Sequence, residues 1–270
     1  MAIFNLKIAG HTGTVSSLFE STPQYFKNYL TQESSEFSFC VTREDIAFEQ
    51  ADLLEEAHRD GFKPRVFTDP FLERAAIQRA FAEFLFERDT LLFHGSSIAV
   101  DGEGYLFTAH SGTGKSTHTR LWMRAFGDRA VMVNDDKPFL QWDGERVWLC
   151  GSPWSGKHGL DANIRVPLKG LCILERGAEN RIEQVSAAEV LPMLQKQAYR
   201  PLEEHKETAF LQLVDRLSQA VPLWKMACNK NPDAAHIAFE AMHNKTQVPS
   251  HLGFSYARIA RSEENSLPLA

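Results

Sequence analysis

The apolar positions of residues 1–88 predict a small α/β domain. Alternating hydrophobic side chains indicate strands at 3–8 and 37–41, and a short helix follows Pro23, where apolar residues recur every three to four positions. A longer helical stripe runs from 71 to 86 and is formed by Leu72, Ala76, Ala80, Phe81, Phe84 and Leu85. We expect this last helix to lead into a second domain.

Short apolar runs bounded by Gly and Asp dominate residues 89–245. They predict strands at 91–93, 105–107, 131–133, 147–149 and 170–174, then helices near 186–198 and 206–219, a strand at 222–228 and a last helix from Pro232 to about His243. Asp101–Gly104 is typical of a hairpin turn and is expected to join the first two of these strands, and Asp143-Gly144 marks a second hairpin. We therefore expect a second domain over 89–245 and a mobile, polar C-terminal tail over 246–270.

One segment of the second domain has the pattern of a phosphate-binding loop. Ala109-His110-Ser111-Gly112-Thr113-Gly114-Lys115-Ser116-Thr117 follows an apolar strand and precedes a helix with an apolar stripe. A glycine-rich turn allows consecutive backbone N–H groups to face one anion, and the helix N-terminus adds partial positive charge. We expect Ser111 to Thr117 to bind nucleotide phosphates, with Lys115 reaching the outer phosphates and the Ser116 hydroxyl binding Mg²⁺. The full pattern has glycine where this chain has Ala109.

Two adjacent carboxylates follow this loop in the sequence. Asn134-Asp135-Asp136 ends an apolar strand about twenty residues after Lys115. In phosphate-binding-loop proteins a carboxylate at this position binds the magnesium ion, and a second carboxylate can accept the proton of an attacking hydroxyl. The alternative interpretation is a plain strand-end turn, because Asn and Asp favour such positions. The phosphate-loop pattern upstream favours the functional interpretation.

Residues 91–136 resemble the catalytic domain of HPr kinase/phosphorylase and, more distantly, the nucleotide site of phosphoenolpyruvate carboxykinase. The matching pieces are Phe93-His94-Gly95, the loop from Ala109 to Ser116, and Asn134-Asp135-Asp136. The resemblance extends more loosely to about residue 175. The chain also resembles kinase-like relatives of that family, among them enzymes that act on ribosomally made peptides.

The resemblance implies an α/β fold: a phosphoenolpyruvate carboxykinase/HPr kinase-like P-loop domain with a mixed sheet, preceded by the small α/β domain. It also implies that His94 lies near the transferred phosphoryl group and that Lys115 is catalytic. One of the paired aspartates would be the base, Asp136 rather than Asp135, which leaves Asp135 for the metal; the reverse assignment stays open. The chain departs from HPr kinase at Thr117, where that family usually has glutamate.

Residues 151–157 also depart from the family and allow two interpretations. In the first, the two glycines and Lys157 of Gly151-Ser152-Pro153-Trp154-Ser155-Gly156-Lys157 form a second anion-binding loop near the γ-phosphate or the acceptor. In the second, the segment is a surface loop with a packed Trp154 and a solvated lysine. His110 and His118 flank the phosphate loop, where side chains often point outward, and neither is assigned a role.

Composition narrows the function classes. The 270 residues carry a formal net charge of −6 and no dense Lys/Arg run, so nucleic acid is not an expected partner. No apolar run approaches the ~20 residues of a membrane span, so no membrane partner is expected either. The four cysteines are far apart, which is typical of reduced thiols in a cytoplasmic protein, and no zinc site is expected.

These observations lead to one main hypothesis and two alternatives. The main hypothesis is an ATP- and Mg²⁺-dependent kinase that transfers the γ-phosphoryl group to a serine-type hydroxyl on a peptide, protein or small molecule. One alternative is a carboxykinase-like lyase, and the other is a nucleotide-sensing regulatory module without turnover. Two carboxylates and His94 are more catalytic groups than sensing requires. The acceptor, a reverse phosphorylase reaction and the formation of a homo-oligomer stay open.

Overall fold

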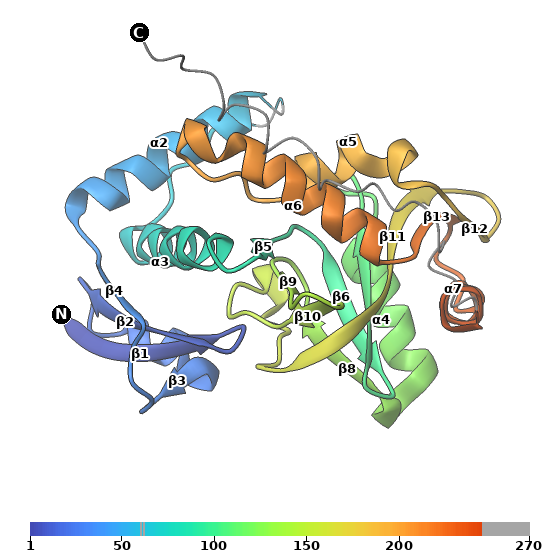
Figure 1. Ribbon diagram of the computed structural model, residues 1–270, viewed down its shortest axis with the longest axis horizontal. Helices are drawn as coiled ribbons and strands as arrows, with labels where there is room; N and C mark the ends of the chain where they lie inside the picture. The colour runs from blue at the N-terminus through green and yellow to red at the C-terminus, as the bar shows by residue number, and fades with distance from the viewer. Residues whose placement is uncertain (60, 62, 245–270) are drawn as a thin grey trace, which may run out of the picture.

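The chain is a mixed α/β protein with a small N-terminal mixed sheet and a larger, curled mixed sheet (Figure 1). The computed structural model describes residues 1–59, 61 and 63–244. The tail that the sequence predicts over 246–270 lies outside the described residues.

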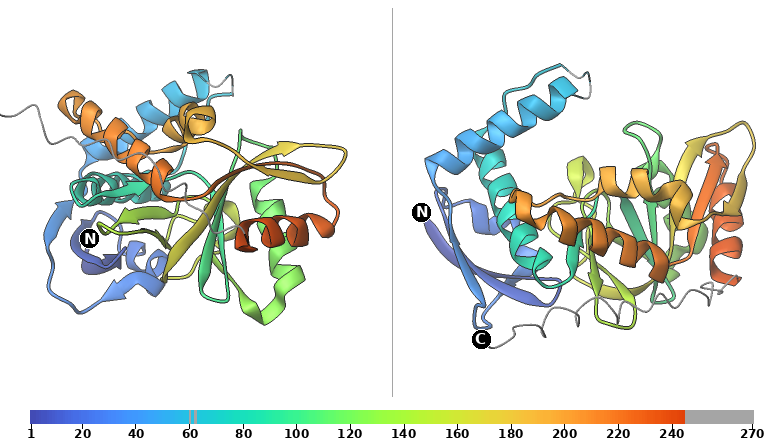
Figure 2. Two further views of the ribbon diagram at one scale, coloured as in Figure 1. Left: turned by 45° about the vertical axis from the view of Figure 1, so that its right-hand side comes forward. Right: turned by 45° about the horizontal axis from the view of Figure 1, so that its top comes forward.

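The N-terminal sheet has the strand order β3-β1-β2-β4, in which β2 and β4 run parallel and the other pairs antiparallel. Its elements are β1 (Ala2–Ile8), β2 (His11–Ser17), α1 (Thr22–Tyr25), a 3-10 helix (Lys27–Tyr29), β3 (Leu30–Thr31) and β4 (Phe37–Cys40). Helices α2 (Arg43–Arg59) and α3 (Asp69–Phe86) follow, and α2 projects away from the sheet as a light-blue arm (Figure 2). The predicted strands, the short helix after Pro23 and the helix at 71–86 are confirmed.

The larger sheet has the order β5-β9-β10-β11-β7-β6-β8, and β13 and β12 extend it from β11. Its strands are β5 (Thr90–Leu92), β6 (Ser96–Val100), β7 (Glu103–Thr108), β8 (Ala130–Asn134), β9 (Phe139–Trp142), β10 (Val147–Cys150), β11 (Arg165–Arg176), β12 (Arg181–Gln184) and β13 (Leu223–Cys228). Its helices are α4 (Lys115–Phe126), α5 (Ala187–Gln197), α6 (Glu207–Ala220) and α7 (Asp233–Asn244), with 3-10 turns at Gly127–Arg129, Gly156–His158 and Glu204–Lys206.

Opposite faces of this sheet carry different helices. Successive side chains of a strand point to opposite faces. Accordingly, Leu106 of β7 packs in the core with α5 and α6, whereas its neighbours Tyr105 and Phe107 pack in the core with α4 and α7. The long strand β11 pairs antiparallel with β10 through its first residues and parallel with β7 and β13 further on.

Several strands were not predicted, and one predicted connection is wrong. The turn at Asp101–Gly104 joins β6 to β7, not the strand at 91–93, because β5 pairs instead with β9. Strand β6 begins with Ser96 and Ser97, which are fully buried but polar and therefore hide the apolar pattern. Polar composition also conceals β2, β12 and helix α2.

One hydrophobic core joins the two predicted domains. Residues 1–88 contribute Leu6, Val15, Phe26 and Phe81 to it, and the later part of the chain contributes Leu92, Phe139, Cys150 and Trp154. The Trp154 ring packs edge-on against Phe26 and donates its indole N–H to the backbone oxygen of Arg74 at 2.9 Å. A continuous core favours unfolding of the two parts together.

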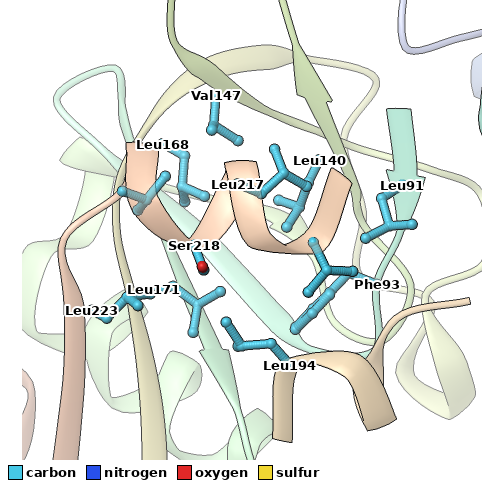
Figure 3. Close-up of a pocket in the computed structure, with 12 residues that line it drawn as sticks. Leu91, Phe93, Leu140, Val147, Leu168, Leu171, Leu194, Leu217, Ser218 and Leu223 are labelled. Atoms are coloured by element: carbon cyan, nitrogen blue, oxygen red, sulfur yellow. The ribbon is translucent and has the colours of Figure 1, made fainter. Parts of the chain in front are cut away.

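A small cavity lies in the core under α6 (Figure 3). Its volume is about 20 Å³, and apolar side chains such as Leu91, Leu171 and Leu217 line it together with Ser218. The Ser218 hydroxyl donates to the backbone oxygen of Asp215, so it is satisfied within its own helix. The space is close to the minimum for one water molecule, and its apolar lining gives such a water few partners. It is a packing gap, not a ligand site.

The sequence also led to expectations about membrane spans and about the cysteines. Among the helices of the described residues, none has both the length and the hydrophobicity that a bilayer span requires. The cysteines are free thiols: Cys150 and Cys172 are buried, Cys228 is half-buried and Cys40 is exposed.

We expect Trp154→Ala to lower the free energy of unfolding by about 3–5 kcal/mol, because it removes the aromatic ring that fills the shared core. Urea unfolding followed by both circular dichroism and tryptophan fluorescence should show one transition at a lower midpoint. Leu211→Ala, at a position 38% exposed on α6, is the control and should stay within about 0.5 kcal/mol of the wild type. Two separate transitions in the wild type would contradict the shared core.

Candidate functional site

The glycine-rich segment forms the turn between β7 and α4, as the sequence predicts. Gly112 and Gly114 have φ angles of +76° and +124°, which side-chain-bearing residues rarely adopt. Ala109 is fully buried and is not among the residues with positive φ, so alanine fits at the position where the full pattern has glycine. The turn therefore needs glycine at two positions, and the sequence supplies both.

The first turn of α4 has backbone N–H groups that no capping side chain uses. Gly114 is the N-cap residue, no side chain caps the helix, and no acidic residue lies in its first turn. The Lys115 ammonium bends back over the loop and donates to the backbone oxygen of Ala109 at 3.2 Å. From the end of β11, Arg176 donates to the backbone oxygen of Gly112 at 2.6 Å and holds the loop from the other side. These features favour an anion at the loop.

A buried asparagine organises the end of β8. The Asn134 side-chain oxygen accepts from the backbone N–H of Asp136 at 2.7 Å and of Lys137 at 2.5 Å, which turns the chain sharply after the strand. Its amide nitrogen donates to the backbone oxygen and the hydroxyl of Ser152 at 2.8 and 3.0 Å. Asn134 thus connects the strand end to the loop that begins after β10.

This turn separates the two aspartates. Asp135 is 5% exposed and accepts a hydrogen bond from the Ser96 hydroxyl at 2.6 Å. The Ser96 hydroxyl also lies 2.7 Å from that of Thr119, which is on the first turns of α4. Asp135 is therefore linked to the helix that follows the glycine loop. Asp136 instead points toward His94, with 3.3 Å between its Oδ1 and the histidine Nε2.

The charges around Asp136 determine the protonation of both partners. Burial favours the protonated form of Asp136, but the Lys137 and Lys115 ammonium groups and the contact with His94 outweigh burial and lower its pKa. Burial lowers the pKa of His94, and the positive charge of Lys137 lowers it further despite Asp136. At neutral pH the pair is a carboxylate facing a neutral imidazole. Burial also lowers the pKa of Lys115, partly offset by Asp136.

The segment 151–157 lies against this pair. A Cβ on Gly156 would lie 3.2 Å from the Cβ of Asp136, so the loop passes directly over that side chain. Trp154 is packed in the core, as one of the two interpretations predicts, and Lys157 is exposed at the same cleft as Asp136. The packed Trp154 and the exposed Lys157 agree with the second interpretation, although residues 151–155 are buried and do not form a surface loop. Whether Lys157 binds an anion stays a prediction.

His94, Asp136, Lys137 and Lys157 line a cleft of about 860 Å³. The cleft extends from this group of residues between α3 and the segment after α5 toward the arm formed by α2. Ser111 and Gly112 lie exposed on the loop, whereas Thr113, Gly114, Ser116 and Thr117 are half-buried. The described lining of the cleft includes no residue of the glycine loop, and Lys115 interacts with the cleft-lining Asp136 through its charge.

Sequence reasoning missed two residues of this region, Arg176 and Lys137, and it did not anticipate the hydrogen-bonding role of Asn134. Arg176 is far from the glycine loop in sequence, and no motif marks it. Lys137 directly follows the aspartate pair and could have been recognised by that position. His118 does not point outward: it is 2% exposed and accepts a hydrogen bond from the indole N–H of Trp122. It lies one turn into α4, on the face that packs against Phe107 of β7.

Binding of a nucleotide with Mg²⁺ stays a prediction, which the chemistry of the residues present supports. The uncapped first turn of α4, the two glycines with positive φ and the Lys115 ammonium suit an anion. Within the described residues no group of three or more His, Cys, Asp and Glu side chains could hold a metal. Mg²⁺ needs only one or two protein ligands beside phosphate and water. Ser116 and Asp135 are the residues that would hold it.

We expect the stability of the protein to fall as the pH drops from 6.5 to 4, partly through His118. Burial lowers its pKa to about 4, so in this range the unfolded chain binds a proton that the folded chain does not. The full effect is about 3 kcal/mol. His118→Gln retains an acceptor for Trp122 but cannot titrate, so urea unfolding at pH 7, 5.5 and 4.5 should show a smaller decline. An equal decline in variant and wild type would contradict this role.

Comparisons with known proteins give likenesses to solved structures alone. No family model matches the chain, and no curated protein matches it. Among solved structures, it is similar to the Hpr(Ser) kinase/phosphatase from Coxiella burnetii, with a TM-score of 0.34 and 11% identity over 57% of this chain and 97% of that chain. A likeness at this TM-score establishes neither a family nor a function.

Proposed function

We propose that the chain is an ATP- and Mg²⁺-dependent kinase that transfers the γ-phosphoryl group to a serine-type hydroxyl on a peptide, protein or small molecule. The observation that carries this proposal is Asp136, a carboxylate of lowered pKa that faces the cleft and interacts electrostatically with both His94 and Lys115. Phosphoryl transfer needs a base near the acceptor and a cation near the phosphates. In this proposal Asp136 is the base, and Lys115 of the glycine turn is the cation.

In this proposal the glycine loop and Lys115 hold the phosphates. The backbone N–H groups of Gly114, Lys115 and Ser116 lie at an uncapped helix start, where they and the partial positive charge of the helix would stabilise an anion. Lys115 would leave the backbone oxygen of Ala109 and bind the outer phosphates. Mg²⁺, held by Ser116 and Asp135, would neutralise charge on the phosphates.

Asp136 would orient the acceptor hydroxyl and accept its proton. Its lowered pKa keeps it ionised at neutral pH, so it is ready to accept. Nε2 of His94 lies 3.3 Å from Oδ1 of Asp136, and the neutral tautomer that carries its proton on Nε2 would fix the direction of that carboxylate. The backbone fixes His94 in turn, since its N–H donates to the oxygen of Gln197 at 2.7 Å. The catalytic contribution is positioning plus charge stabilisation.

A nucleotide-binding module without turnover is the second candidate function. The same loop would serve it, and the exposure of Ser111 and Gly112 leaves room for a nucleotide that dissociates unchanged. The position of Asp136 on the cleft favours the kinase, because sensing does not require a base that faces the cleft. Calorimetric titration with ATP, followed by a phosphate-release assay, separates the two.

We expect Lys115→Ala to weaken Mg²⁺-dependent ATP binding at least about tenfold, because each charge-assisted hydrogen bond contributes ~1.5–3 kcal/mol. Isothermal titration of ATP into folded wild type and variant measures the change. Lys169→Ala removes another partly buried lysine, one paired with Glu103 away from the loop, and should leave ATP affinity unchanged. Equal affinity of the Lys115 variant and the wild type would contradict the assignment.

We expect Asp136→Asn to retain ATP affinity but to lower phosphoryl transfer by about 10²–10⁴-fold, since it removes the general base. Asp135→Asn should instead raise the Mg²⁺ concentration that half-maximal turnover needs. Turnover of labelled ATP measured at several Mg²⁺ concentrations distinguishes the two effects. If the Mg²⁺ requirement changes in Asp136→Asn instead, the roles are reversed. If both variants turn over ATP at the wild-type rate, the kinase mechanism is wrong.

A further inference from the structure

The cleft beside Asp136 is much longer than the region around the catalytic candidates. Phe48, Asp52, Glu56 and Arg59 of α2 all line it, and they recur at helical spacing along one side of the arm. Eleven residues of helix correspond to a length of about 16 Å. A chain in extended conformation covers that distance with about five residues. The cleft thus has the length of a peptide segment.

Large apolar side chains are exposed on the walls of this cleft. Tyr25, Phe48, Phe71 and Leu202 are exposed by 42%, 41%, 40% and 52%, and all of them line it. They come from α1, α2, α3 and the segment after α5, which are separate parts of the chain. Exposed apolar side chains gathered in one cleft are typical of a binding surface. They favour a partner with bulky apolar side chains of its own.

The charge of the cleft differs from that of the chain. Of the described residues that line it, seven are arginine or lysine and four are aspartate or glutamate, although the whole chain has a net charge of −6. Three of the seven, Lys137, Lys157 and Arg74, line the Asp136 end, and the guanidinium of Arg74 lies 4.4 Å from the centre of the Tyr25 ring. Away from that end, Arg79 is paired with Asp45 and Glu49, and Arg200 is paired with Glu207. Asp52 and Glu56 line the far wall on α2. Acidic groups of a partner are therefore favoured at the Asp136 end.

We propose that this cleft binds the acceptor as an extended protein segment, with acidic residues next to the hydroxyl and bulky apolar residues further along. The arm α2 and the wall at Leu202 would hold the segment while its hydroxyl reaches Asp136. This inference rests on the proposed kinase function for the identity of the bound segment as acceptor. Binding of the segment itself does not require ATP.

Three fluorescein-labelled nonapeptides test the surface by anisotropy without nucleotide. The first has glutamates next to a central serine and phenylalanines further out, the second has lysines in place of the glutamates, and the third has alanines in place of the phenylalanines. We expect the first to bind at least about fivefold more tightly than the others, because it alone matches both charge and apolar walls.

Charged substitutions locate the binding. Phe48→Asp and Leu202→Asp should each weaken binding of the first peptide at least about fivefold, because they place a carboxylate on an apolar wall. Leu211→Asp is the matched control: it is 38% exposed on α6, does not line the cleft, and should change affinity less than about twofold. Thermal melting checks that all three variants are folded.

The outcomes separate this inference from the kinase proposal. Equal binding of the three peptides, or a loss in Leu211→Asp as large as in Phe48→Asp, would overturn the docking surface even if ATP turns over normally. Selective binding that both cleft variants weaken would support the surface. If no ATP binding is then detected, the kinase proposal fails, the surface remains, and the bound segment is not an acceptor.

Discussion

The arrangement of the candidate site depends on the hydrogen bonds of one buried side chain, Asn134. Its oxygen holds the backbone of Asp136 and Lys137 in a turn, while its nitrogen holds the loop at Ser152. An extended continuation of β8 would also alternate its side chains, but it would not fold the backbone of Asp136 and Lys137 back onto Asn134. With the turn, Asp135 faces the first turns of α4 through Ser96, and Asp136 faces His94 and the cleft. The backbone turn therefore determines which partner each of the two carboxylates faces.

The same asparagine explains why both parts of the chain are needed around the cleft. The loop that it holds continues to Trp154, whose ring lies in the core shared with α3 and the N-terminal sheet. Further along, Asp161 accepts hydrogen bonds from Ser155 at 2.5 Å and from Tyr29 of the N-terminal region at 3.0 Å. The position of Asp136 is thus coupled to the packing of residues 1–88, which also supply α2 and α3 as cleft walls.

The sequence is sufficient to predict those elements in which hydrophobic spacing and turn chemistry agree. The strand, glycine turn and helix at 103–126 are of this kind, and so are α3, α5, α6 and α7. Prediction failed where polar side chains are satisfied by distant partners: Ser96 and Ser97 of β6 bond to Asp135 and to the Asn134 backbone, contacts that no local pattern contains. The proximity of His94 to Asp136 could be anticipated only through a resemblance, since it depends on the pairing of β6 with β8, which places Ser97 opposite Asn134. No sequence pattern indicated that Arg176 contacts the glycine loop.

A carboxylate of lowered pKa is a weak base, and this limits what Asp136 can contribute to the proposed reaction. Phosphoryl transfer proceeds through a loose transition state in most analyses, in which the attacking oxygen needs little negative charge. Under those conditions the base is required chiefly to orient the hydroxyl and to receive the proton late, which a weak base held by His94 can do. The lysines that lower the pKa of Asp136 would simultaneously attract the phosphates and an acidic acceptor. The weakness of the base and the positive charge of the cleft therefore have one physical origin, the cluster of Lys115 and Lys137 around a half-buried carboxylate.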